Sequence, residues 1–313
     1  MKAIAVDLGG TNIKAAIVDS EKGILEQTST PTHADLGKEH LLDRIASTIN
    51  ELKSEEVIGI GMGLPGMVSL DHTTVKSPPN LPGWDVVNVS EEMFQRTSMH
   101  CRVENDANVA ALGSLYFGVG KDIGSFIMIT LGTGVGGGII FDRKLFKGGS
   151  GMAGELGHVI IDYHGPLSNS VTRGTVEAFL GQRFLSRFAS DMILQKPDNP
   201  LYTRFHRDFD KLEPIDLTSE AAKGNELAIE ILKKSGQRLG YGIINYVHMM
   251  DIRKIVLSGG VSKAGDWLFE PAKEIVHKHM MPPFLDGFEM IYEDLGNDSA
   301  LLGAAGLAFD TLA

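Results

Sequence analysis

Residues 7–19 read Asp-Leu-Gly-Gly-Thr-Asn-Ile-Lys-Ala-Ala-Ile-Val-Asp, and residues 130–142 read Thr-Leu-Gly-Thr-Gly-Val-Gly-Gly-Gly-Ile-Ile-Phe-Asp. The two segments align without a gap at an offset of 123 residues. An apolar run precedes and follows each turn, so each segment predicts a strand, a glycine turn and a second strand. Glycine turns let a ligand approach backbone N–H groups. The repeat therefore predicts a duplicated cradle that holds the phosphate chain of a nucleotide from two sides.

Length, charge and cysteine content limit the class of protein. The chain has 313 residues, which exceeds the usual size of one core and predicts two domains. Its net charge of −11 argues against a nucleic-acid or membrane-surface partner. Cys101 is the only cysteine, which excludes an internal disulfide and a Cys-based metal cage. The first apolar run, 3–6, is too short for a signal peptide or membrane span, so we expect a cytoplasmic protein.

Hydrophobic periodicity predicts strands and helices in a β-α-β order without a long linker. The expected strands are a hairpin over 2–19, then 24–28, 57–62, 101–104, 125–131 with a hairpin reaching 146, and 254–257. The expected helices are 38–53, one opened by Asn88 and Glu91 as a capping box, 107–117, 218–234, 235–250, and 299–312 capped by Asp298.

Two other glycine motifs can be set aside. The spacing Gly-x-Gly-x-x-Gly occurs at 61–66 and 132–137, but neither match leads into a helix as a dinucleotide fold requires. A Walker loop needs Ser or Thr after Gly-Lys, and Gly120-Lys121 is followed by Asp122. The remaining interpretation is the duplicated hairpin fold of sugar kinases, actin and the 70-kDa chaperones.

Six segments make this interpretation specific, because together they resemble the ROK family of sugar kinases and sugar-responsive repressors. They occur in the order of the family and span nearly the whole chain. The segments are Asp7-Leu8-Gly9-Gly10-Thr11, Gly63-Leu64-Pro65-Gly66, Asn80-Leu81-Pro82-Gly83-Trp84, Glu104-Asn105-Asp106-Ala107-Asn108, 131–138 and Gly154-Glu155-Leu156-Gly157-His158.

The resemblance implies an α/β fold of two actin-like lobes, built on duplicated ribonuclease-H-like domains, with ATP and sugar in the cleft between them. We expect an N-terminal lobe of 1–117 plus 297–313 and a C-terminal lobe of 118–296. The chain is most similar to a glucokinase-like member. The family is often dimeric or tetrameric, so we expect a homo-oligomer, with a dimer as the first expectation.

Asp106 is the expected general base. A strand that ends at Glu104 and a helix that starts near Ala107 place Asp106 at a helix N-terminus, where it or Asn105 could simply be the N-cap. The resemblance implies that Asp106 takes the proton from the attacking sugar hydroxyl and that Asn105 binds the sugar. The helix dipole would keep the carboxylate of Asp106 ionised.

The two turns are the expected nucleotide site. The resemblance implies that Asp7 faces the magnesium of Mg-ATP, through water, although an acidic turn cap is the alternative. Lys14 could add charge or simply be a solvated lysine on a strand. The remaining cofactor-binding residues implied by the family are Gly9, Gly10, Thr11, Gly132, Thr133, Gly134, Gly259 and Gly260.

The expected sugar ligands include Glu155 and His158, which are three residues apart and would share one side of a helical turn. The resemblance adds Glu177 as a further sugar-binding residue. Gly66 could allow close approach to the sugar or merely turn the chain. The alternative for His158 is a core histidine satisfied by the backbone.

One segment departs from the family. Many members carry Cys-x-Cys-Gly-x-x-Gly-Cys-Leu-Glu, whose cysteines bind a structural zinc, whereas residues 168–177 read Ser-Asn-Ser-Val-Thr-Arg-Gly-Thr-Val-Glu. Hydroxyls are poor zinc ligands. We therefore predict no zinc and a loop held by hydrogen bonds and packing.

The sequence thus predicts an ATP-dependent kinase that phosphorylates the primary hydroxyl of glucose or a related aldohexose. N-acetylglucosamine and N-acetylmannosamine are the alternative substrates. A sugar-sensing repressor is disfavoured because Asp106 is retained and the first hairpin begins at residue 2, without a preceding helix-turn-helix. An actin-like or chaperone-like ATPase leaves the segment at 154–158 without a role.

Overall fold

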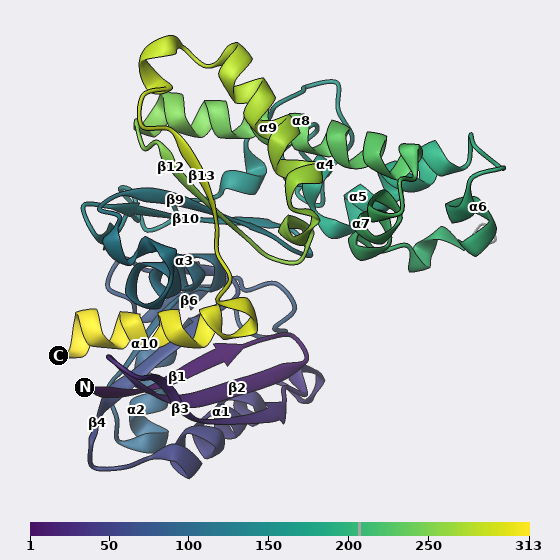
Figure 1. The fold of residues 1–313 in the computed structure, drawn as a ribbon. Coiled ribbons are helices and arrows are strands. Elements are labelled where there is room, and N and C mark those ends of the chain that lie inside the picture. Colours follow the sequence, from purple (N-terminus) through teal and green to yellow (C-terminus); the bar gives the residue numbers. More distant parts are fainter. Residues whose placement is uncertain (206–207) are drawn as a thin grey trace. The chain divides into compact units, whose positions relative to one another are not determined.

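The computed structural model describes residues 1–205 and 208–313 of a mixed α/β chain (Figure 1). The strands are β1 Lys2–Leu8, β2 Asn12–Asp19, β3 Gly23–Pro31, β4 Val57–Leu64, β5 Met67–Val68, β6 Thr74–Lys76, β7 Val86–Asn88, β8 Cys101–Asn105, β9 Phe126–Leu131, β10 Val135–Phe141, β11 Lys144–Leu145, β12 Lys254–Ser258 and β13 Glu289–Tyr292. The α-helices are α1 Lys38–Leu52, α2 Val89–Thr97, α3 Asp106–Phe117, α4 Glu177–Leu180, α5 Gln182–Ile193, α6 Pro200–Phe205, α7 Pro214–Ala222, α8 Glu226–Met250, α9 Asp266–His279 and α10 Ser299–Leu312.

Two five-stranded sheets repeat one topology. Their orders are β3-β2-β1-β4-β8 and β11-β10-β9-β12-β13, so each consists of a hairpin, its third strand and two further strands beside the first. In the first sheet β4 runs parallel to both β1 and β8, and in the second β12 runs parallel to both β9 and β13. The duplication that the two glycine segments predict is confirmed.

The register of the first sheet brings the predicted acidic residues to one edge. Asp7 on β1 is paired with Gly63 on β4, and Gly63 is paired with Glu104 on β8. Neighbouring strands lie about 4.8 Å apart, so the backbones of Asp7 and Glu104 are roughly 10 Å apart. Because the three strands are parallel, the turn after β1 and the start of α3 lie at the same edge.

The core follows the alternation of side chains along β1. Ile4, Val6 and Leu8 belong to one buried cluster with residues of α1, whereas Ala3 and Ala5 belong to a second cluster with residues of α10. Small residues on the second face let α10 approach closely, and α10 packs on α3, β1 and β4 (Figure 1).

One predicted helix boundary is wrong. The sequence predicts a break between residues 234 and 235, but α8 continues through Ser235, and the break is at 223–225. Gly224 has a φ of +83°, and the Asn225 side chain caps α8 by accepting from the N–H groups of Leu227 and Ala228.

The two predicted caps have different outcomes. Asn88 caps α2 by accepting a hydrogen bond from the N–H of Glu91 at 3.0 Å. Asp298 precedes α10 as predicted, but its backbone is helical, and within the described residues its side chain makes no capping hydrogen bond. A 3-10 turn at Gly296–Asp298 leads into α10 instead.

Contacts within the chain define two compact units. Unit 1 comprises 1–125, 138–154 and 294–313, and unit 2 comprises 126–137 and 155–293. The predicted lobes are defined by the ligands that each would hold, so their bounds remain a prediction.

Candidate functional site

Hydrogen bonds hold the first glycine turn in place, and the space beside Gly10 is open. The N–H of Gly9 donates to the carbonyl of Asn12 at 3.0 Å, and the Thr32 hydroxyl donates to the carbonyl of Gly9 at 2.7 Å. The N–H of Thr32 also donates to the carbonyl of Thr11 at 2.8 Å. A Cβ built at Gly10 would meet nothing within 4 Å. Gly10 is therefore not required by packing, and its backbone is accessible to a ligand.

Asp7 stands at the strand end before this turn. Burial raises the pKa of the Asp7 carboxyl, and the charge of Lys14, its partner in the β1–β2 register, acts in the opposite direction. A half-buried carboxylate whose ionisation is costly is a suitable ligand for a cation, because a bound cation favours the charged form. The magnesium-facing role of Asp7 stays a prediction.

Two backbone hydrogen bonds of Gly132 hold the second glycine turn in place. The N–H of Gly132 donates to the carbonyl of Gly134 at 3.0 Å, and the carbonyl of Gly132 accepts from the N–H of Gln182 at the start of α5 at 2.9 Å. A Cβ at Gly132 would meet nothing within 4 Å. This glycine, like Gly10, leaves open space beside its backbone.

Glu177 lies against this second turn. One carboxylate oxygen, Oε2, accepts the N–H of Val135 at 3.1 Å, and a Cβ at Gly134 would come within 2.4 Å of the same oxygen. A larger residue at position 134 would therefore displace the end of the Glu177 side chain. The structure connects a residue that the sequence analysis assigns to the sugar with the turn that it assigns to phosphate.

Gly259 and Gly260 follow β12 beside the same turn. Ser258 is paired with Thr130, and a Cβ at Gly259 would come within 2.3 Å of the carbonyl oxygen of Leu131. Gly259 has a φ of +95°, whereas a Cβ at Gly260 would meet nothing within 4 Å. Gly259 is thus required by the backbone, and Gly260 leaves open space.

Asn105, rather than Asp106, is the N-cap of α3. The Asn105 Oδ1 accepts from the N–H groups of Ala107 at 2.9 Å and Asn108 at 3.4 Å, while its Nδ2 donates to the carbonyl of Gly66 at 3.2 Å. Asp106 is the first helical residue, is exposed, and accepts the N–H of Ala107 at 2.9 Å. Both alternatives for this junction are therefore resolved locally: Asn105 caps the helix, and Asp106 presents a carboxylate at its N-terminus.

Gly66 is required by the chain itself. Its φ is +111°, and a Cβ there would come within 2.8 Å of the Cα of Pro78. Its carbonyl accepts the hydrogen bond from Asn105. Gly66 thus turns the chain and helps to fix the Asn105 side chain.

Glu155 and His158 come together as the spacing predicts. The His158 Nε2 lies 3.6 Å from the Glu155 Oε2, and the N–H of His158 donates to the carbonyl of Glu155 at 3.1 Å. A 3-10 turn at Leu156–His158 supplies this geometry. His158 is 43% exposed, so it is not a core histidine.

Hydroxyls occupy the loop where the family carries cysteines. The Ser170 Oγ lies 3.2 Å from the His158 Nδ1 and 2.9 Å from the Ser168 Oγ. The N–H of Ser168 donates to the carbonyl of Thr172 at 2.9 Å. The contact from Ser170 to His158 was missed by the sequence analysis, although the replacement of cysteine by serine was visible.

A buried ionic cluster next to Asp106 was also missed. Glu104 is 0% exposed, and its Oε2 lies 2.6 Å from the Lys147 Nζ and 2.8 Å from the His72 Nδ1. Its Oε1 accepts from the N–H of Asn105 at 2.9 Å and from the Asn108 Nδ2 at 3.0 Å. In the sequence, an acidic residue at an otherwise buried strand position was the available signal.

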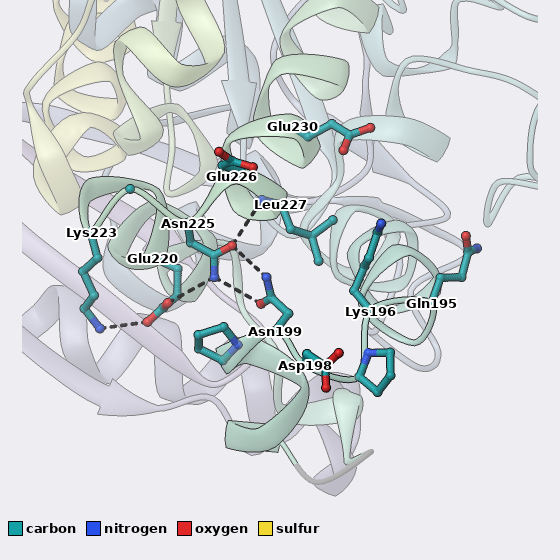
Figure 2. A pocket seen from close by; sticks show the side chains of 13 residues that line it. Gln195, Lys196, Asp198, Asn199, Glu220, Lys223, Asn225, Glu226, Leu227 and Glu230 are labelled. Atoms are coloured by element: carbon teal, nitrogen blue, oxygen red, sulfur yellow. Dashed lines mark hydrogen bonds and ion pairs between the residues drawn. The ribbon is translucent and has the colours of Figure 1, made fainter.

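Unit 2 also contains a pocket that none of the predicted site residues line. Residues 195–200 and the break between α7 and α8 form it (Figure 2). Its amides satisfy one another, because Asn199 and Asn225 exchange hydrogen bonds of 2.9 and 3.1 Å. Lys223 lies 2.8 Å from the Glu220 carboxylate.

The described residues offer no metal-binding cluster, reactive thiolate or membrane-spanning helix. Within residues 1–205 and 208–313, no group of three or more His, Cys, Asp or Glu side chains could hold a metal ion. Burial raises the pKa of the Cys101 thiol to about 12, so Cys101 is not a reactive thiolate. Among the described helices, none is long and apolar enough to cross a membrane.

Comparison with known proteins finds sugar kinases that match nearly the whole chain. A glucokinase of Thermotoga maritima is 33% identical over 308 residues, which cover 98% of this chain and 97% of that protein. A solved putative sugar kinase from Cytophaga hutchinsonii is 31% identical with a TM-score of 0.87, covering 99% of this chain and 100% of that one. A ROK family glucokinase from Streptomyces griseus, solved with glucose and AMPPNP, is 30% identical with a TM-score of 0.80 and covers 99% of this chain and 100% of that one.

These likenesses confirm the predicted fold class, that of the two-domain actin-like sugar kinases. The family model for ROK proteins matches residues 3–311. The six segments that suggested the resemblance lie inside this match. The chain therefore belongs to the ROK family.

Proposed function

We propose that this ATP-dependent sugar kinase phosphorylates the primary hydroxyl of glucose or a closely related aldohexose. The general class rests on full-length similarity to glucokinases. The identity of the sugar and the residue roles are our inference from the site.

The observation that carries the proposal is the junction between β8 and α3. Asn105 supplies the cap, and the exposed carboxylate of Asp106 lies at the N-terminus of the helix. Asp7 lies at the same edge of the same sheet, two strands from the end of β8, where the backbones of Asp7 and Glu104 are roughly 10 Å apart. A base and a metal-facing carboxylate at one edge of a sheet suit phosphoryl transfer to a hydroxyl.

In the proposed reaction, Asp106 accepts the proton of the sugar hydroxyl as its oxygen forms a bond to the terminal phosphorus of ATP. The bond from that phosphorus to the bridging oxygen breaks, and ADP leaves with the electron pair. Backbone N–H groups of the two glycine turns, other than those of Gly9 and Gly132 that already donate within the turns, would donate to phosphate oxygens. Magnesium bound with ATP would neutralise phosphate charge, and Asp7 would orient it, through water.

The sugar would be oriented by hydrogen bonds from several side chains. Glu155 and His158 form one pair, and Ser170 would fix the orientation of the imidazole. Glu177 would bind the sugar through Oε1 while Oε2 keeps its hydrogen bond to the second turn. We also keep as proposals a zinc-free loop, a homo-oligomer such as a dimer, and a cytoplasmic location.

The test is ADP release measured over a panel of aldohexoses, N-acetylglucosamine and N-acetylmannosamine. Asp106→Asn should lower kcat with glucose by about 100- to 10,000-fold, the contribution of a general base. Asp266→Asn is the matched control, because Asp266 is also an exposed first residue of a helix, α9, without a predicted role. ATP turnover that needs neither sugar nor Asp106 would refute the kinase mechanism, and preference for an N-acetylhexosamine would replace the proposed substrate.

A further inference from the structure

Glu104 is a fully buried carboxylate with neighbouring polar groups at both of its oxygens. Lys147 and His72 contact Oε2, and Asn105 and Asn108 contact Oε1. Burying an ion pair is costly, and an apolar pair of similar volume often serves stability as well. Stability alone therefore does not explain why these charged side chains are buried together.

The contacts of Oε1 bracket Asp106 in the sequence. One donor is the backbone N–H of the residue before Asp106, and the other is the side chain of Asn108, two residues after it. The Asn105 side chain is itself held at both ends, by the first turn of α3 and by Gly66. Glu104 thus holds the backbone before Asp106 and the side chain of Asn108 after it.

The contacts of Oε2 anchor Glu104 to two other segments. The Lys147 Nζ also donates to the carbonyl of Ser69 at 2.7 Å. His72 has a φ of +58°, and its carbonyl accepts the N–H of Val103 at 2.9 Å. The loop between β5 and β6 and the segment after β11 are therefore tied to the end of β8.

The electrostatics keep Glu104 charged. Burial acts to raise the pKa of the Glu104 carboxyl, but the adjacent His72 imidazole and the charge of Lys147 outweigh it and hold that pKa below its usual range. A charged Glu104 accepts stronger hydrogen bonds than a neutral one.

We propose that Glu104, Lys147 and His72 are positioning residues that hold the Asp106 carboxylate in the geometry needed to accept the sugar proton. The inference rests on the proposed function, in which Asp106 is the base. A displacement of about 1 Å at a reacting group can cost on the order of a hundredfold in rate. The network would therefore affect kcat rather than the binding of ATP.

The experiment replaces the pair by neutral side chains of similar length. In Glu104→Met/Lys147→Met, we expect kcat to fall about 10- to 100-fold while the KM for ATP stays within about twofold. Glu104→Gln/Lys147→Met keeps an acceptor for Asn105 and Asn108, so it should recover most of kcat. Arg204→Met/Asp216→Asn is the matched control, because it removes an ion pair of unit 2 with the same 2.6 Å contact and should leave kcat unchanged.

A cycle with Asp106→Ala separates positioning from a general structural effect. If Glu104 acts through Asp106, the Met pair should lower the residual rate of Asp106→Ala no further. Thermal unfolding checks that each variant is folded at the assay temperature. If the Met pair does not fold, His72→Ala takes its place with His72→Asn as its rescue, since asparagine offers a donor near the Nδ1 position and tolerates positive φ.

The outcomes are distinguishable. A wild-type kcat in the folded Met pair, or fold-losses that multiply with those of Asp106→Ala, would overturn the positioning role and leave the proposed function intact. Full activity of Asp106→Ala would instead refute the proposed function, and the positioning role with it. A lower kcat with an unchanged KM for ATP, rescue by Gln and a non-additive cycle together would support the inference.

Discussion

Gly10→Ala separates a glycine kept for a ligand from one kept for the fold. A Cβ at residue 10 would meet nothing within 4 Å, and the φ of Gly10 lies outside the left-handed region. The folded chain should therefore tolerate alanine. Because alanine has fewer unfolded conformations, the free energy of unfolding should rise by about 0.4–1 kcal/mol.

The same methyl group should impair ATP binding. A phosphate oxygen that accepts the N–H of residue 10 would lie about 2.9 Å from its nitrogen. The methyl group of an alanine at residue 10 would displace a phosphate oxygen that approaches this backbone. Losing one hydrogen bond to a charged group costs about 1.5–3 kcal/mol. The KM for ATP should then rise roughly tenfold to a hundredfold, with the KM for sugar little changed.

Gly124→Ala is the matched control, because its Cβ also meets nothing within 4 Å and its φ is also outside the left-handed region. It has no predicted ligand role. Chemical denaturation and ADP-release kinetics on both variants test the reasoning. If Gly10→Ala and Gly124→Ala have the same KM for ATP, the first turn does not hold the phosphates.

Three further predictions concern single side chains. Asp7→Asn should raise the free energy of unfolding of the ligand-free protein at neutral pH, because the raised pKa of Asp7 in the folded state means that its ionisation costs stability as pH rises from the ordinary pKa of 3.8 through the folded one. Denaturation measured across this pH range should show the variant to be more stable, and magnesium-ATP should stabilise it less than the wild type. An unchanged free energy of unfolding would contradict the prediction. Val171→Gly should raise the free energy of unfolding by about 1 kcal/mol, because Val171 is β-branched with a φ of +60° and 85% exposed; a lower unfolding temperature would show that the residue is unstrained. Ser170→Ala should raise the KM for sugar more than the KM for ATP. Separately, a chelator should leave activity unchanged when magnesium is in excess. One zinc per chain after dialysis would disprove the zinc-free loop.

The sequence predicts the fold well where the signal is local. The two hairpins, α1 and α3 follow from alternation, helical periodicity and caps within short windows. The boundary within 214–250 was missed because Ser235-Gly236 looks like a break. In the structure, a Cβ at Gly236 would come within 2.2 Å of the Leu268 carbonyl oxygen, so this glycine lets α9 pack on α8.

The contacts around the site are harder to predict because they join distant segments. Lys147 is 43 residues from Glu104, and Val135 is 42 residues from Glu177. Motif spacing identifies such residues one at a time, but only the register of the sheets shows which of them meet. The buried cluster at Glu104 is therefore a finding of the structure, whereas Asp106 is a prediction from sequence.

The duplicated hairpins differ in the reason for each glycine. Gly10 and Gly132 leave open space, which is what a ligand that approaches the backbone requires. Gly134 lies against the Glu177 carboxylate, and the same carboxylate oxygen accepts the N–H of Val135, so the second turn contacts a side chain of α4. In the proposed mechanism, a sugar bound at Oε1 of Glu177 would be linked through Oε2 to the turn that is proposed to hold phosphate. This contact would couple sugar to nucleotide at the second hairpin, whereas Asp7 at the matched position of the first hairpin would face the metal.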